Sequence, residues 1–265
     1  MQKIACITLD LESDHAGRIH SEPLTWKKQQ MTQLINICRK HHVQLSVFVV
    51  GRMLNKENSL VNALKRFGAD FYLHSNSHDI NNPDSAREIL QGRQQFFSYF
   101  RHLPLGYRAP EGRISISGMR RLKKYGFVFD ASVFPSFWPA IKYMGYPNIP
   151  YKDSSGLVEI PNTTVSPAQL IFTLSWIKLF GWKFYELIIS RYNLPNLVVF
   201  SFHLHDLWRS PRFNQLPIFW KFIYKNNQQN GMQYLENILE FLSSHEYKFT
   251  TLNHVAKSLY KGKTH

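Results

Sequence analysis

Five side chains capable of chemistry stand at the ends of short apolar segments of the sequence. They are Asp10, His74, Arg108, Asp130 and His203. Each segment has the length and composition of a β-strand. In a β/α barrel the carboxyl ends of all strands meet at one face, and active sites lie there. The sequence therefore predicts that these five residues gather at one end of a barrel.

Two of these strand ends offer ligands for a metal ion. Side chains alternate along a strand, so Asp10 and Glu12 can point to the same side, and one carboxylate can bind a metal while the other accepts a proton. In His-Ser-Asn-Ser-His, His74 and His78 can reach one ion, and neutral imidazole is a common zinc ligand. Taken alone, each motif also fits a plainer role, as a solvated acidic turn or a chance pair among 12 histidines.

Two further strand ends offer a fixed cation and a proton donor. Arg108 begins the segment Arg-Ala-Pro-Glu-Gly, a rigid loop whose guanidinium can keep a catalytic carboxylate ionised by lowering its pKa. His203 follows an apolar strand, where it can serve as a general acid. A structural salt bridge and a hydrogen-bonded histidine at the barrel rim are the plainer alternatives.

Strand-like and helix-like segments alternate along the chain. Strands are predicted over residues 4–9, 43–50, 70–73, 127–129, 157–160, 197–202 and 248–252. Helices are predicted over residues 26–42, 59–67, 85–100, 116–125, 232–245 and 253–260. This alternation indicates an α/β protein with a mostly parallel sheet. Because a β/α barrel of about 250 residues nearly fills the 265-residue chain, one domain over residues 1–265 is expected.

The order of the motifs resembles the polysaccharide deacetylase family, also called the NodB-homology or carbohydrate esterase family 4-like group. The resemblance runs from Ile4 to about Ala256 and is most specific in His-Ser-x-x-His and Tyr-Arg-Ala-Pro-Glu-Gly. It implies a distorted, incomplete β/α barrel of about seven strands. It also implies a metal-dependent hydrolase that removes an acetyl or formyl group from the nitrogen of an aminosugar.

The resemblance also implies a role for each catalytic residue. Asp10 would be the general base that takes a proton from the attacking water, and Arg108 would steady it. His203 would be the general acid that protonates the leaving amine. Pro110 and Glu111 would contact the substrate, with a backbone N–H near Glu111 stabilising the oxyanion.

The metal ligands implied by the resemblance are His74, His78 and one carboxylate of the first motif, with Zn²⁺ the expected ion. Many family members have two adjacent aspartates in that motif, but Leu11 stands in the second place here. Glu12 is therefore expected to be the third ligand, with Asp14 as the alternative. A second question stays open, because either Asp130 or Asp206 could orient His203.

The charge and the aromatic segments bear on the partner. The chain has a net charge of +14, which favours anionic partners. Nucleic acid is disfavoured, because the aromatic residues stand in apolar runs and no RNA- or DNA-binding motif is present. Residues 170–189 include three charges, Lys178, Lys183 and Glu186, which exclude a membrane-spanning helix.

An amphipathic insertion around residues 166–192 is therefore expected, either as an ordinary helix packed on the barrel or as a helix lying in a membrane surface. Residues 216–224 and 134–138 have a similar character. The first residues lack the apolar core of a secretory signal, so a cytoplasmic location is expected, with Cys6 and Cys38 reduced. These features favour a lipid-phosphate-linked sugar at the cytoplasmic membrane face over a soluble or polymeric aminosugar.

Two other functions fit the same sequence. The first is an inactive relative that binds carbohydrate or lipid, and the second is a metal-dependent amidase acting on an amide outside sugars. Inactive relatives often lose a site residue, whereas Asp10, both motif histidines and Arg108 are all present here.

Overall fold

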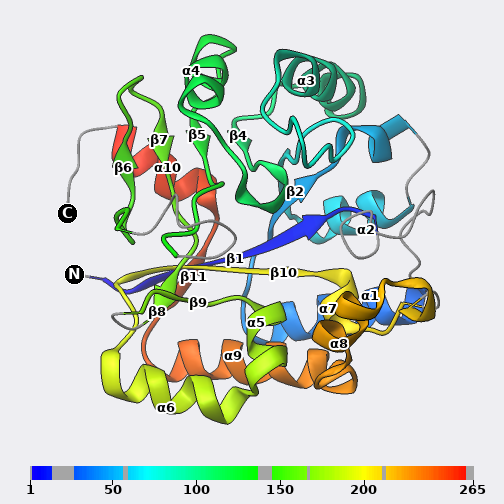
Figure 1. Ribbon diagram of the computed structural model, residues 1–265, viewed down its shortest axis with the longest axis vertical. Helices are drawn as coiled ribbons and strands as arrows, with labels where there is room; N and C mark the ends of the chain where they lie inside the picture. The colour runs from blue at the N-terminus through cyan, green and yellow to red at the C-terminus, as the bar shows by residue number, and fades with distance from the viewer. Residues whose placement is uncertain are drawn as a thin grey trace.

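The computed structural model describes residues 2–13, 27–55, 59–136, 145–165, 168–210 and 213–260. Its centre is a curled sheet of nine strands in the order β10-β1-β2-β3-β4-β5-β7-β6, with β11 also paired to β1 (Figure 1). The strands are β1 Ile4–Leu11, β2 Ser46–Val49, β3 Asp70–Leu73, β4 Gly106–Tyr107, β5 Phe129–Asp130, β6 Tyr151–Lys152, β7 Val158–Glu159, β10 Leu197–His203 and β11 Lys248–Thr250. All pairings are parallel except that of β6 with β7.

The predicted fold class, an incomplete β/α barrel, is confirmed. The sheet has more strands than the expected seven or so, because β4 and β6, at two residues each, are too short to leave a periodic pattern. A separate two-stranded sheet, β8 Thr164–Val165 with β9 Leu170–Ile171, was also not expected.

Ten α-helices lie within the described residues and pack mainly around the sheet (Figure 1). They are α1 Lys28–Lys40, α2 Ser59–Phe67, α3 Ala86–Phe100, α4 Ile116–Lys124, α5 Leu174–Phe180, α6 Trp182–Tyr192, α7 Leu204–Leu207, α8 Ile218–Lys225, α9 Gly231–Ser244 and α10 Leu252–Tyr260. Serine caps begin two of them: Ser85 Oγ accepts a hydrogen bond from the Glu88 N–H, and Ser115 Oγ accepts one from the Gly118 N–H.

Strand β1 explains how the sheet positions the site. It is buried on both faces, as expected for a central parallel strand. Its alternate residues Ile7 and Leu9 pack in the large cluster under the helices, whereas Cys6 packs in the second cluster with Phe48 of β2. Asp10 follows at even spacing on the same side as Cys6 and is paired in register with His203 of β10. Strand alternation and register thus bring two predicted catalytic residues together.

The amphipathic insertion expected around residues 166–192 as a helix is not one continuous helix. The segment forms β9, then α5, then α6, and Gly181 separates the two helices at φ 91°. Such a positive φ is accessible mainly to glycine, so the chain changes direction there. No helix in the described part of the chain is long and apolar enough to cross a membrane. Both cysteines are buried and free, as expected.

Candidate active site

Glu12, His74 and His78 form a buried cluster at the carboxyl end of the sheet. Their ligand atoms lie within 4.8 Å of one another. The Glu12 Oε2 atom is 2.6 Å from His78 Nε2 and 3.2 Å from His74 Nε2. The structure therefore brings together the three residues predicted as metal ligands. Asp14, the alternative carboxylate, lies outside the described residues.

The backbone fixes both histidines of this cluster. The His74 Nδ1–H donates to the Arg108 carbonyl over 2.8 Å, so in the neutral ring the lone pair is on Nε2, which faces Glu12. The His78 N–H donates to Ser75 Oγ, and both Ser75 and His78 have a positive φ, at 58° and 61°. Non-glycine residues in this conformation are uncommon and concentrate at functional sites.

The donor atoms of the cluster fit a divalent metal ion. Glu12 Oε1 is buried and has no hydrogen-bond partner among the described residues. Burial would raise the pKa of Glu12, but His78, His74 and His203 together lower it well below its usual range, so the carboxyl group is anionic. Two imidazoles and one carboxylate are a ligand set found at catalytic zinc sites, which keep a further position open.

Arg108 is buried at the base of the site and forms an ion pair with Asp10. Its Nη1 lies 2.7 Å from Asp10 Oδ1 and 2.9 Å from Thr8 Oγ1, and its Nε donates to the Ala131 carbonyl. Its Nη2 donates to Asn162 Oδ1 over 3.2 Å. The side chain is 1% exposed, so this is a buried ion pair with a fixed geometry. Sequence analysis missed Asn162, which is 54 positions away in the chain and carries no local signal.

His203 faces both carboxylates of the first motif. Its Nε2 lies 3.8 Å from Asp10 Oδ2 and 3.8 Å from Glu12 Oε1. Its Nδ1 lies 3.0 Å from Asp206 Oδ2, and Asp206 is fully buried and also accepts from Ser175 Oγ. Burial alone would lower the pKa of His203, but the hydrogen bond to Asp206 and the nearby carboxylates raise it to about 9. His203 is therefore protonated at neutral pH and has a proton to give.

Asp130 does not join the other four strand-end residues in the cleft. It is fully buried, and its Oδ1 accepts from Ser132 Oγ, which in turn accepts from the Ala109 N–H. Burial raises the pKa of Asp130 to about 6, and burial together with Asp130 raises that of Glu159 well above its usual range. Through Ser132, Asp130 supports the backbone of the loop after Arg108, whereas Glu159 accepts from the Val133 N–H. Of the two acids left open by the sequence, Asp206 is the one that contacts His203.

These residues share a cleft of about 810 Å³ with an apolar wall. One side holds Asp10, Glu12, His74, His78, Arg108 and His203, and the other holds Trp176, Leu179, Phe180, Phe219, Trp220 and Tyr224 from α5 and α8. Glu111 also lines the cleft, at φ 51°, and its side chain pairs with Arg113 over 2.9 Å. Pro110, predicted to contact substrate, is buried and is not among the lining residues. His205 lines the cleft too, its ring stacked on that of His203 at 4.7 Å.

Comparison with known proteins agrees with this arrangement. The model of the family named polysaccharide deacetylase matches residues 17–129. The resemblance identified in the sequence is thus confirmed, and the matched residues include His74, His78 and Arg108. No match was found among curated proteins.

Solved structures of polysaccharide deacetylases share the fold. A putative polysaccharide deacetylase from Mycobacterium smegmatis is 16% identical with a TM-score of 0.62, covering 99% of this chain and 92% of its own. A family 4 carbohydrate esterase from Streptomyces lividans, solved with acetate, is 15% identical with a TM-score of 0.53, covering 94% and 93%. A family 4 pseudoenzyme from Bacillus anthracis is 10% identical with a TM-score of 0.53, covering 96% and 66%. At these identities the likeness shows the fold alone.

The contact between His203 and Asp206 predicts a change in pH dependence. Without the anion of Asp206 the pKa of His203 falls from about 9 toward its ordinary value near 6.5. Because a general acid works only while protonated, Asp206→Asn should move the alkaline limb of kcat/KM to lower pH by about one to two units. The pH profiles of the two proteins, measured with the same substrate, check this.

The matched control is Asp130→Asn, which removes a buried carboxyl group of the same type from outside the cleft. It should leave the alkaline limb in place, whatever it does to stability. A shift of the limb in Asp130→Asn, or no shift in Asp206→Asn, would contradict the assignment of Asp206 to His203.

Proposed function

We propose that this protein is a metal-dependent hydrolase that removes an N-linked acetyl or formyl group from an aminosugar. The observation that carries the proposal is one cleft holding a two-histidine, one-carboxylate cluster between a carboxylate fixed by an arginine and a protonated histidine. Amide hydrolysis needs three things: an activated water, a base for its proton and an acid for the leaving nitrogen. The cleft offers a group for each.

The residues divide this chemistry between them. Glu12, His74 and His78 would hold a divalent ion such as Zn²⁺, which would supply an acidified water and polarise the amide carbonyl. Asp10, held by Arg108 at 2.7 Å, takes the proton from that water. The His203 Nε2–H gives a proton to the leaving nitrogen, and Asp206 stabilises the imidazolium before the transfer. The hydroxide left from the attacking water adds to the acyl carbon. The C–N bond then breaks, and a carboxylate and an amine are released.

Acyl release from simple sugars tests this proposal. The metal-loaded protein should release acetate or formate from N-acetyl or N-formyl aminosugars. The variant with both His74 and His78 replaced by alanine serves as the blank. Turnover of simple anilides but not of sugars would favour the non-sugar amidase. Absence of turnover on every N-acyl sugar would favour an inactive binding relative, as in the family 4 pseudoenzyme.

We further propose that the sugar is linked to a lipid phosphate and is met at a membrane surface. The apolar wall of the cleft continues outward onto α8, where Ile218, Phe219 and Phe222 are 86%, 57% and 75% exposed. Exposed apolar side chains grouped on one short helix indicate an interaction surface. Lys221 and Lys225 on the same helix, with the net charge of +14, suit an anionic headgroup layer. The cytoplasmic face stays a prediction from the sequence.

Partitioning onto liposomes tests the membrane part. Ile218 and Phe222 are exposed and do not line the cleft, so Ile218→Ser with Phe222→Ser alters the surface and spares the site. The wild type should sediment with phosphatidylglycerol vesicles at low salt. The double variant should bind at least about tenfold more weakly, because each apolar side chain contributes up to about 1.5–3 kcal/mol when buried.

Ile116, which is 58% exposed on α4, is a matched control, and Ile116→Ser should partition like the wild type. If the wild type does not bind these vesicles, or binds as tightly without the two α8 side chains, the membrane proposal fails. A soluble or polymeric aminosugar then becomes the favoured substrate.

A further inference from the structure

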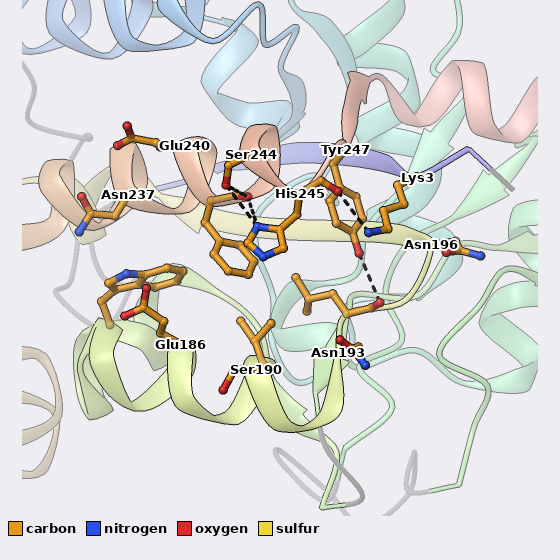
Figure 2. A pocket seen from close by; sticks show the side chains of 14 residues that line it. Lys3, Glu186, Ser190, Asn193, Asn196, Asn237, Glu240, Ser244, His245 and Tyr247 are labelled. Atoms are coloured by element: carbon orange, nitrogen blue, oxygen red, sulfur yellow. Dashed lines mark hydrogen bonds between the residues drawn. The ribbon is translucent and has the colours of Figure 1, made fainter.

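A second cavity of about 830 Å³ lies between α6 and α9, away from the candidate active site (Figure 2). Lys3, Asn196 and Tyr247, which line it, stand directly before β1, β10 and β11. The candidate catalytic residues Asp10 and His203 stand at the opposite ends of β1 and β10. The seven residues of β10 span about 23 Å at roughly 3.3 Å per residue, so the α6–α9 groove is separate from the cleft.

The groove has an aromatic centre. The Trp182 and Phe241 rings meet edge to face at 5.6 Å, and the Phe241 and His245 rings stack at 4.0 Å. The His245 Nδ1–H donates to the Phe241 carbonyl, which fixes the ring against its neighbour and leaves Nε2 as an acceptor. Ile189 and Leu194 add apolar surface to the same groove. The centre thus offers flat apolar faces held by contacts within the protein.

A rim of polar side chains surrounds this centre. It comprises Glu186, Ser190 and Asn193 on or next to α6, Asn196 before β10, and Asn237, Glu240 and Ser244 on α9 (Figure 2). Lys3 is the one lysine or arginine among the lining residues, and its Nζ is already placed, 3.3 Å from the His245 carbonyl and over the Tyr247 ring. The lining thus carries two carboxylates and one lysine in a chain of net charge +14, and Glu240 also interacts with Lys40 outside the groove.

This lining suits a particular kind of ligand. A sugar ring presents apolar C–H faces and an edge of hydroxyl groups, so it can lie against aromatic faces while amide, hydroxyl and carboxylate groups hydrogen-bond its edge. The carboxylates repel phosphates and other anions. An ammonium group is attracted by the carboxylates and also by the aromatic faces, through cation–π interactions. A purely apolar ligand would leave the polar rim desolvated and unpaired.

We propose that the α6–α9 groove is a second glycan site that takes an oligosaccharide bearing free amino groups. This choice of ligand rests on the proposed function, whose product is such an amine. The groove would then hold a deacylated stretch of glycan while the cleft, at the other end of the barrel, meets a different part of the chain or another molecule.

Calorimetric titration with the β-1,4-linked tetramer of glucosamine tests the proposal, with the fully N-acetylated tetramer as the comparison. The wild type should bind the glucosamine tetramer more tightly. Trp182→Ala should weaken that binding about tenfold or more, because a half-buried tryptophan in a groove is a typical main contributor to affinity. Glu186→Gln should weaken the binding of the glucosamine tetramer about threefold to fivefold. The affinity for the acetylated tetramer should stay unchanged.

Matched variants lie beside the groove without lining it. Leu187→Ala on α6 controls for Trp182→Ala, and Glu246→Gln controls for Glu186→Gln, and both controls should bind as the wild type does. Because Glu186 is exposed, its variant should fold even if Trp182→Ala does not.

The metal-site variant with His74 and His78 replaced should keep full affinity for the tetramer. This separates the second site from the proposed function, since loss of acyl release would leave binding intact. No binding by the wild type would overturn the proposal. So would binding that survives both groove variants, or binding that disappears only in the metal-site variant, which would place the tetramer in the cleft.

Discussion

The metal content of the purified protein is expected to fall from about one divalent ion per chain to none when His74 and His78 are both replaced by alanine. The two imidazoles and Glu12 supply three ligand atoms within 4.8 Å, and one carboxylate alone cannot hold the ion at micromolar concentration. The ion is expected to contribute several kcal/mol of transition-state stabilisation, so kcat/KM should fall by about three powers of ten or more. Elemental analysis and acyl-release kinetics measure the two effects.

The chain offers a matched pair of histidines for this experiment. His102 and His254 are both exposed and lie outside the cleft. Replacing both with alanine therefore also removes two imidazole groups but leaves the cluster intact. That variant should retain the metal and the activity. A wild type that stays metal-free after addition of zinc would remove the basis of the catalytic proposal and leave a deacetylase fold with another use.

The sequence predicted the parts of the site that depend on strand ends and local spacing. Asp10 and His203 are neighbours because β1 and β10 pair in register, and parallel strands place their last residues at one edge. The link from His203 to Asp206 is also local, since the two are three positions apart at the start of α7. In principle this spacing could have decided between Asp130 and Asp206.

Other parts depended on the way distant segments meet, which no local pattern records. Asp130 ends β5 as predicted, yet it faces Ser132 and Glu159 behind the cleft, because the pleat and the neighbouring strand decide which side a strand-end residue faces. Asn162 reaches Arg108 from a loop 54 residues further on. The single glycine at 181 divides a segment whose composition suggested one helix.

The aromatic segments were also predicted only in part. Their amphipathic character predicted that one face would be buried, and Leu174 and Ile177 of α5 do pack in the main core. Periodicity does not say what the other face meets. In the structure Trp176 and Phe180 of that helix form a wall of the cleft with α8, a contact set by the tertiary fold.

Replacing Arg108 with methionine is expected to cost about 3–5 kcal/mol of unfolding free energy, the usual effect of removing one partner from a buried ion pair. Arg108 is 1% exposed, and its guanidinium donates hydrogen bonds to Asp10 over 2.7 Å, to Thr8 over 2.9 Å and to the Ala131 carbonyl over 2.9 Å. Methionine fills part of the volume over the Phe48 ring but donates no hydrogen bond, so Asp10 is left as a buried anion without its partner. Urea unfolding followed by circular dichroism measures the loss.

Two further variants separate the charge from the packing. Arg113 also pairs with a carboxylate, Glu111, at 2.9 Å, but its side chain is 49% exposed, so Arg113→Met should cost less than about 1 kcal/mol. Adding Asp10→Asn to Arg108→Met removes the stranded anion and should restore part of the stability, although not the activity, because Asp10 is the proposed base. If Arg108→Met were as stable as Arg113→Met, the buried pair would not be the support of the catalytic carboxylate. If the double variant were no more stable than Arg108→Met, the cost would lie in packing and the other hydrogen bonds instead of in the charge of Asp10.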